Sequence, residues 1–303
     1  MKRIGDFFRL IKTAAKSFIE DDAMKLSASL SYYTVFALGP VLLLIISLAG
    51  IFWGREALEG KIFHEIRGLV GNSAAYQVQH MIGSLARSEN TTAGAVVGII
   101  MLVIGATGVF TEIQSSINYI WSIRAKPKKG LVRLLLNRLI SFSLVVATSF
   151  ILLVALIINA LVELLNDKLA SIFPDTAVII FNILNYITIY VVITALFTII
   201  FRVLPDASIS WKDAIRGAAF TAILFLLGKF AIGFYIGNAS FGKTYGTAAS
   251  IIIILVWVYY SSVILYFGAS FTKAYSLRYG SGIKPDKSAV FIIKRESKEV
   301  PVN

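Results

Sequence analysis

The sequence from Thr244 to Thr272 reads TYGTAASIIIILVWVYYSSVILYFGASFT and contains no charged residue between Lys243 and Lys273. Coiled as an α-helix at ~1.5 Å per residue, this run exceeds the ~30 Å hydrocarbon core of a bilayer. Backbone polar groups in hydrocarbon need hydrogen-bond partners within their own segment. The run therefore predicts a helix that crosses a membrane.

Five other segments of the chain have the same character. Each contains an apolar run longer than the ~18 residues that distinguish a membrane span from a buried helix, and only Lys229 interrupts one of these runs. We expect an all-α integral membrane protein with six transmembrane helices, preceded by a cytoplasmic segment 1–25 and followed by a cytoplasmic basic tail 276–303. Within the domain 26–275, the predicted spans are 26–54, 90–121, 139–162, 176–201, 214–238 and 244–272.

Composition supports the same class of protein. Of the 303 residues 57% are hydrophobic and only 15% are charged, the mean hydropathy is +0.78, and there is no cysteine. Soluble domains usually contain about 25% charged residues. The absence of cysteine excludes disulfides and thiolate chemistry. A soluble enzyme is thus not expected.

The distribution of positive charge predicts the orientation. Of the 29 Lys and Arg residues, 22 lie in segments 1–25, 124–138, 202–216 and 273–298, and 6 lie in the alternate connections. Basic residues accumulate in cytoplasmic loops. Both termini are therefore expected in the cytoplasm, and Trp121, Trp211 and the Tyr32–Tyr33 pair are expected at the membrane interfaces.

Two segments outside the spans have amphipathic helical patterns. The N-terminal segment places basic residues opposite an apolar face, which suits an anionic inner leaflet or serves as a topology anchor. The first outer loop, Arg55–Glu89, predicts two short external helices that either cap a cavity or lie at the interface. The tail from about Gly280 is polar, contains Pro285, and is expected to be mobile. The apolar face of the first segment comprises Ile4, Phe7, Phe8, Ile11, Ala14, Ala15, Phe18 and Ile19.

Several polar residues fall within the predicted spans and form the candidate intramembrane site. Glu112 follows an uncharged run and precedes Gln114 and Asn118, and Lys229 interrupts the fifth span. Ionisable groups at depth cost ~2.5–3.5 kcal/mol on insertion scales, which makes them functional candidates. We hypothesise that Glu112 and Lys229 share a polar interior. The alternative is that Lys229 extends its stem toward the interface while polar neighbours hold Glu112.

The first span contains Gly39-Pro40 near its middle. Proline removes one backbone hydrogen bond, so a helix kink is expected there. Such a kink serves either helix packing or the formation of a transport site, since transporters build sites from broken helices.

A series of short motifs runs through the chain in order. The series resembles the YihY/virulence factor BrkB family of bacterial inner-membrane proteins, formerly mislabelled ribonuclease BN, over about residues 20–275. The resemblance implies a multi-pass protein of the bacterial cytoplasmic (inner) membrane with six helices, and it implies no agreed activity. The motifs are LSASLSYYT (26–34) with Gly39-Pro40, GATGVF (105–110), NYIW (118–121), LPD (204–206), WKDA (211–214), Gly217-Ala218, Gly228-Lys229, Tyr235, FGKTYG (241–246), WVYYSS (257–262) and FGA (267–269).

Catalytic chemistry is not evident in the sequence. The two histidines, His64 and His80, lie in the predicted outer loop, and the cytoplasmic acids are scattered without metal-ligand spacing. No nucleotide-binding or metalloprotease motif is present, so no cofactor, metal or nucleic acid is expected. Ribonuclease activity is therefore not expected on chemical grounds.

The leading functional hypothesis is transport or translocation of a lipid, amphiphile or small solute. The alternative is a non-transporting scaffold that supports envelope assembly. The expected partners are anionic lipids of the inner leaflet, with a protein partner or a homo-oligomer left open.

Overall fold

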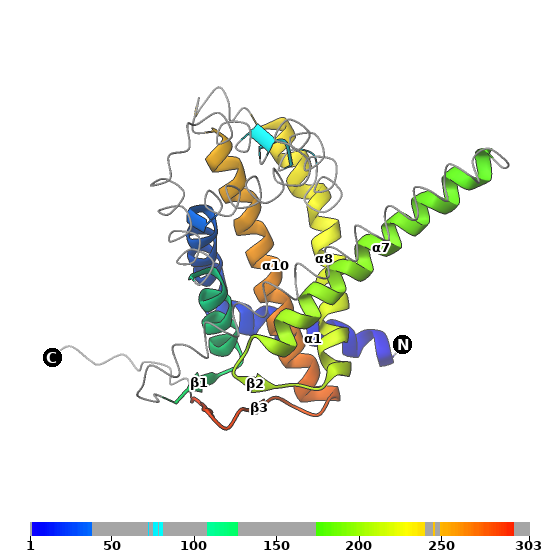
Figure 1. Ribbon diagram of the computed structural model, residues 1–303. Coiled ribbons are helices and arrows are strands. Elements are labelled where there is room, and N and C mark those ends of the chain that lie inside the picture. Colours follow the sequence, from blue (N-terminus) through cyan, green and yellow to red (C-terminus); the bar gives the residue numbers. More distant parts are fainter. Residues whose placement is uncertain are drawn as a thin grey trace, which may run out of the picture.

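The computed structural model describes residues 2–37, 72, 75–77, 79–80, 108–126, 174–239, 245 and 249–293. Long helices dominate this part of the chain (Figure 1). The predicted span 139–162, the Gly39-Pro40 kink and nearly all of the first outer loop lie outside the described residues. The helices are α1 (Lys2–Glu20), helix 23–37, helix 108–120, α7 (Pro174–Val203), α8 (Trp211–Asn238) and α10 (Ala249–Tyr279).

Three of the described helices are long and apolar enough to cross a membrane. The segments are Ile183–Val203, Trp211–Ile236 and Ile251–Tyr279, and they match the predicted spans 176–201, 214–238 and 244–272. Large apolar side chains remain exposed on α7 and α8, among them Tyr186 and Phe234. Extended exposed apolar surface of this kind suits contact with lipid. The described helices fit a multi-span membrane protein, while the count of six and the orientation stay predictions.

Helices α8 and α10 pack through small residues that alternate with threonines. A Cβ on Gly217 of α8 would collide with Thr272 of α10, and a Cβ on Gly268 of α10 would collide with Thr221 of α8. Each threonine hydroxyl donates to the carbonyl of the glycine on its own helix, at 2.7 Å in both cases. The two helices therefore interlock reciprocally, as small residues allow in membrane helix pairs.

Three short segments lie at the lower ends of the helices in Figure 1, and we call them together the basal junction. They are residues 121–126, 204–210 and 280–293. Strand β1 (Ile123–Ala125) pairs with β4 (Ala289–Phe291), and β2 (Ala207–Ser208) pairs with β3 (Lys284–Pro285), both antiparallel. The expectation of a mobile tail is therefore wrong for residues 280–293. Pairing with distant segments, which no local pattern announces, holds this stretch in place.

The last turns of α10 run beyond the predicted span. The helix continues from Thr272 to Tyr279 and ends where the backbone N–H groups of Gly280 and Gly282 both donate to the Ser276 carbonyl. Gly282 adopts a φ of +76°, which glycine tolerates at helix ends. Lys273 thus marks the end of an uncharged run and not the end of the helix.

Helix α1 lies across the base and packs against α10 (Figure 1). Leu10, Ala14 and Phe18 face α10 and are buried, whereas Phe8 and Ile19 are exposed. A turn at Asp21-Asp22, with Asp22 at φ +50°, leads into helix 23–37. Only part of the apolar face of α1 is therefore available to a membrane, because α10 covers the rest.

We expect Gly268→Leu to destabilise the protein by about 1–3 kcal/mol, because the new side chain would force α8 and α10 apart. Gly233→Leu is the matched control, since a Cβ on Gly233 in α8 meets nothing within 4 Å. Thermal unfolding of the detergent-solubilised proteins measures both effects. An equal loss of stability in the two variants would contradict the interlocked packing.

Candidate functional site

Helix 108–120 has an apolar face that packs into the core and a polar face that forms the candidate site. Ile113, Ile117 and Ile120 are buried against the bundle. Thr111, Gln114, Ser115 and Asn118 lie on another face of the helix, where they line a pocket. Residues three and four apart share a helix face, which explains this grouping.

The pocket has a volume of about 500 Å³ and opens beside the basal junction. Arg124 on β1 and Asp206 in the α7–α8 connection add charged groups of opposite sign to its lining. Ile123 and Ile292 contribute apolar surface. The site can accommodate a molecule with both a polar and an apolar part.

Asn118 forms a reciprocal pair of hydrogen bonds with Asp206. Its amide nitrogen donates to the Asp206 carboxylate at 2.8 Å, and its carbonyl oxygen accepts from the Asp206 backbone N–H at 2.9 Å. The Asp206 carbonyl in turn accepts from the N–H of Asp286 in the tail. Asn118 thus fixes one wall of the pocket, a positioning role that sequence reasoning did not assign to it.

The C-terminal end of helix 108–120 is hydrogen-bonded to α10. Lys273 donates from Nζ to the Ile120 carbonyl at 2.5 Å and to Ser122 Oγ at 3.2 Å. Trp121 donates from Nε1 to the Ala269 carbonyl at 3.0 Å and is only 1% exposed. The expectation that Trp121 anchors the chain at a membrane interface is therefore wrong, because its ring lies in the protein core. Trp211, in contrast, is 56% exposed at the start of α8.

Glu112 lies on a different face of its helix from Gln114 and Asn118. It shares a face with Ser116, four residues further along, and Ser116 is a polar neighbour of the fully buried Tyr266 of α10. The predicted group of Glu112, Gln114 and Asn118 is thus distributed over two faces. Gln114 and Asn118 line the pocket, whereas Glu112 lies on the face of the helix that carries Ser116.

Lys229 is partly buried on α8, with its ammonium 5.7 Å from the centre of the Phe230 ring. This placement is compatible with a cation–π contact. Whether Lys229 and Glu112 share one interior stays a hypothesis. The predicted kink at Gly39-Pro40 lies outside the described residues.

A buried carboxylate that sequence reasoning left among the scattered acids joins the ends of α8 and α10. Asp213 Oδ2 accepts from Ser276 Oγ at 3.2 Å, from the Ser281 N–H at 3.1 Å and from Ser281 Oγ at 3.4 Å. Its own backbone N–H donates to Ser210 Oγ at the N-terminus of α8. The spacing Ser210-x-x-Asp213 was the available signal, because it is typical of a helix start.

Metal binding finds no support in the part of the chain that the structure describes. Among those residues, no group of three or more His, Asp or Glu side chains gathers to hold an ion. The arrangement at helix 108–120 can bind and orient a polar group, through an amide, a guanidinium and a carboxylate.

Comparison of the chain with known proteins identifies related membrane proteins. A family model described as virulence factor BrkB matches residues 14–292. A UPF0761 membrane protein of Alcanivorax borkumensis is 28% identical over 285 residues, covering 89% of this chain and 60% of the relative. One from Saccharophagus degradans is 25% identical over 265 residues, covering 87% and 58%, and one from Pseudomonas aeruginosa is 27% identical over 280 residues, covering 88% and 63%. No solved structure matches the chain. The chain thus spans about 60% of the length of these curated relatives.

We expect Asn118→Ala to lower the free energy of unfolding by about 1–3 kcal/mol, because it leaves the Asp206 N–H and carboxylate without these partners. Gln114→Ala, one turn earlier and also in the pocket lining, is the control and should change stability little. Thermal or chemical unfolding in detergent measures the difference. Equal stabilities for wild type and Asn118→Ala would contradict a positioning role for Asn118.

Proposed function

The chain belongs to the virulence factor BrkB family of membrane proteins, and from that premise we propose that it transports or translocates a lipid, another amphiphile or a small solute across the bacterial inner membrane. The observation that carries this proposal is the mixed polar and apolar pocket of about 500 Å³ beside helix 108–120. The proposal includes no catalytic step and no cofactor.

The position of the pocket supports a role in entry or exit at one membrane face. It lies at the basal junction, where Arg124, Lys284 and Lys287 belong to segments that the positive-inside rule assigns to the cytoplasm. On its other face, helix 108–120 carries Glu112 and the buried Ser116, and Ser116 is a polar neighbour of the buried Tyr266. One helix thus connects a pocket at the membrane surface with polar groups inside the bundle.

The second candidate is a membrane scaffold for envelope assembly. Dense packing at the base favours it, since Trp121, Phe201 and Tyr266 are each fully buried in a single core cluster. A scaffold needs a rigid base but no route for a solute. The sequence contains no ATP-binding motif, so transport by this chain would be passive, gradient-driven or powered by a partner.

Flux measurements in reconstituted liposomes separate the two candidates. We expect wild-type protein to increase the flux of at least one candidate lipid or solute over protein-free vesicles. Glu112→Gln should reduce this flux, because it removes a charge from within a predicted span, and Lys229→Met tests the hypothesis of a shared interior. Equal flux in all three proteins would exclude both residues from the mechanism, and no flux with any candidate would favour the scaffold.

The proposed orientation can be tested with single cysteines, because the chain contains no natural cysteine. Lys287→Cys lies at the basal junction, and Asn72→Cys lies in the predicted outer loop; both positions are exposed. With a membrane-impermeant maleimide, we expect Lys287→Cys to react only in inverted vesicles and Asn72→Cys only in intact spheroplasts. Labelling of Lys287→Cys in intact spheroplasts would reverse the assigned orientation.

A further inference from the structure

A groove between α1, α8 and α10 is separate from the pocket beside helix 108–120. It has a volume of about 520 Å³, and Phe7, Leu10, Phe220, Ile223 and Phe271 give it an apolar floor. The rings of Phe220 and Phe271 stack with their centres 3.8 Å apart, and Phe7 meets both rings edge-on. Aromatic packing between three helices therefore forms a preorganised apolar surface.

The mouth of the groove carries positive charge. Arg216 lines it and is exposed; its guanidinium donates to the Tyr275 hydroxyl at 2.9 Å and lies over the Tyr275 ring. This hydrogen bond and the ring hold the guanidinium in one place, which leaves its remaining N–H groups able to bind an anion.

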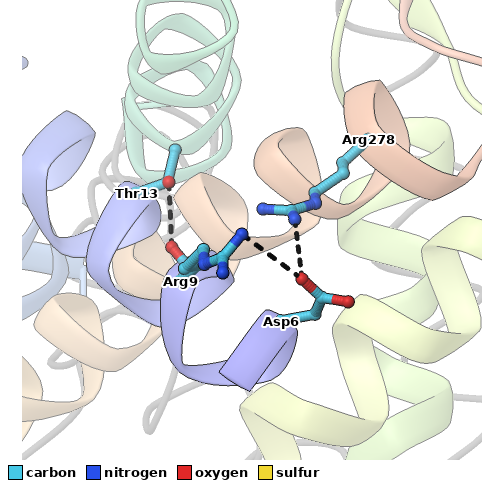
Figure 2. A network of polar contacts seen from close by, with 4 residues as sticks. All are labelled: Asp6, Arg9, Thr13 and Arg278. Atoms are coloured by element: carbon cyan, nitrogen blue, oxygen red, sulfur yellow. Dashed lines mark hydrogen bonds and ion pairs between the residues drawn. The ribbon is translucent and has the colours of Figure 1, made fainter. Parts of the chain in front are cut away.

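The carboxylate in the groove lining is already paired. Asp6 Oδ1 accepts from Arg278 at 3.0 Å and lies 3.8 Å from Arg9, as Figure 2 shows. Two cations thus surround this one carboxylate, and Arg216 adds a third positive charge at the same mouth. The net charge of these four side chains is positive, which favours an anionic ligand. The Asp6–Arg278 ion pair also holds α1 against the C-terminal end of α10.

Beyond the groove, an exposed apolar stripe continues along α8, away from the basal junction. Ile223 is followed on the same face of α8 by Leu227, Phe230 and Phe234, all of which are exposed. Spacings of four, three and four residues place them in one stripe. At ~1.5 Å per residue, Arg216 lies ~16 Å from Leu227 along the helix, about half of the ~30 Å hydrocarbon core.

We propose that this groove binds one anionic phospholipid of the inner leaflet, with its phosphate on Arg216 and an acyl chain along Phe220, Ile223 and Leu227. The charge at the mouth matches the phosphate, and the apolar stripe matches the chain in direction and length. A peptide fits less well, because its backbone polar groups would lie unpaired in hydrocarbon. The proposal does not depend on transport activity, and the lining of this groove shares no residue with the pocket beside helix 108–120.

Native mass spectrometry of the full-length protein, mixed in detergent with phosphatidylglycerol and phosphatidylcholine of identical acyl chains, tests the proposal. Wild type should retain phosphatidylglycerol in preference to phosphatidylcholine. Arg216→Gln should lower phosphatidylglycerol retention about tenfold or more, because a charge-assisted contact is lost. Lys212→Gln, which removes the same charge one turn earlier on α8, should behave as wild type.

Two further variants address the apolar part of the site. Ala219→Trp should fill the groove and abolish retention of both lipids, and Ile223→Ser should weaken retention at a half-exposed position where the fold tolerates the change. Unchanged retention in both variants would overturn the proposal. So would an equal effect of Lys212→Gln and Arg216→Gln, which would indicate diffuse attraction.

Competition and mass identify other occupants. Excess inorganic phosphate should not displace the lipid, since most of the expected contact is apolar. Displacement by phosphate would assign a free-anion site and overturn the proposal. Recovery of a second copy of the chain or a peptide that Ala219→Trp releases, in place of a lipid, would overturn it as well.

Discussion

The last carbonyl groups of a helix need hydrogen-bond partners from elsewhere when the helix ends inside a protein. Helix 108–120 ends in this way, and α10 supplies the partner through Lys273, whose ammonium also favours the negative end of the helix dipole. Trp121 returns a hydrogen bond to the Ala269 carbonyl of α10. These two hydrogen bonds between α10 and the end of helix 108–120 fix the rotation of helix 108–120 about its axis. The rotation in turn determines that Gln114 and Asn118 face the pocket while Glu112 and Ser116 lie on another face of the helix.

The positions of the three described candidate spans could be predicted from the sequence, because hydrocarbon sets a minimum length for an uncharged run that crosses it. The same reasoning does not locate helix ends, since water does not unwind a helix that tertiary contacts stabilise. Helix α10 continues past Lys273 for this reason, with Asp213 holding Ser276 and Ser281 at its end. The order in residues 280–293 was also not predictable, because β3 and β4 find their partners in β2 and β1, far back along the chain. Short strands with distant partners leave no periodic pattern.

The sequence grouped Glu112, Gln114 and Asn118 into one candidate site, and the structure distributes them over two faces of the helix. Glu112 and Gln114 are neighbours in sequence, yet residues two apart on a helix point in different directions. Grouping them by proximity therefore joined a residue that lines the pocket to one that does not. Asn118 was expected as a polar residue within the site, and its contacts with Asp206 indicate that it supports the site from its wall. Identifying Asp206 required the fold, because the α7–α8 connection brings it there.

The way α1 is held changes what an amphipathic N-terminal helix can do. A free amphipathic helix binds a membrane with its whole apolar face. Here Leu10, Ala14 and Phe18 pack toward α10, and Asp6 is paired with Arg278, so the protein sets the depth and tilt of the helix. The surface that α1 leaves uncovered consists of exposed side chains such as Phe8 and Ile19 and of the groove that α1 shares with α8 and α10, where we propose that a lipid binds. Helix α10 packs against α1 and is also hydrogen-bonded to the end of helix 108–120. A change of lipid at α1 would therefore act on α10, the helix that holds the pocket-lining helix in place.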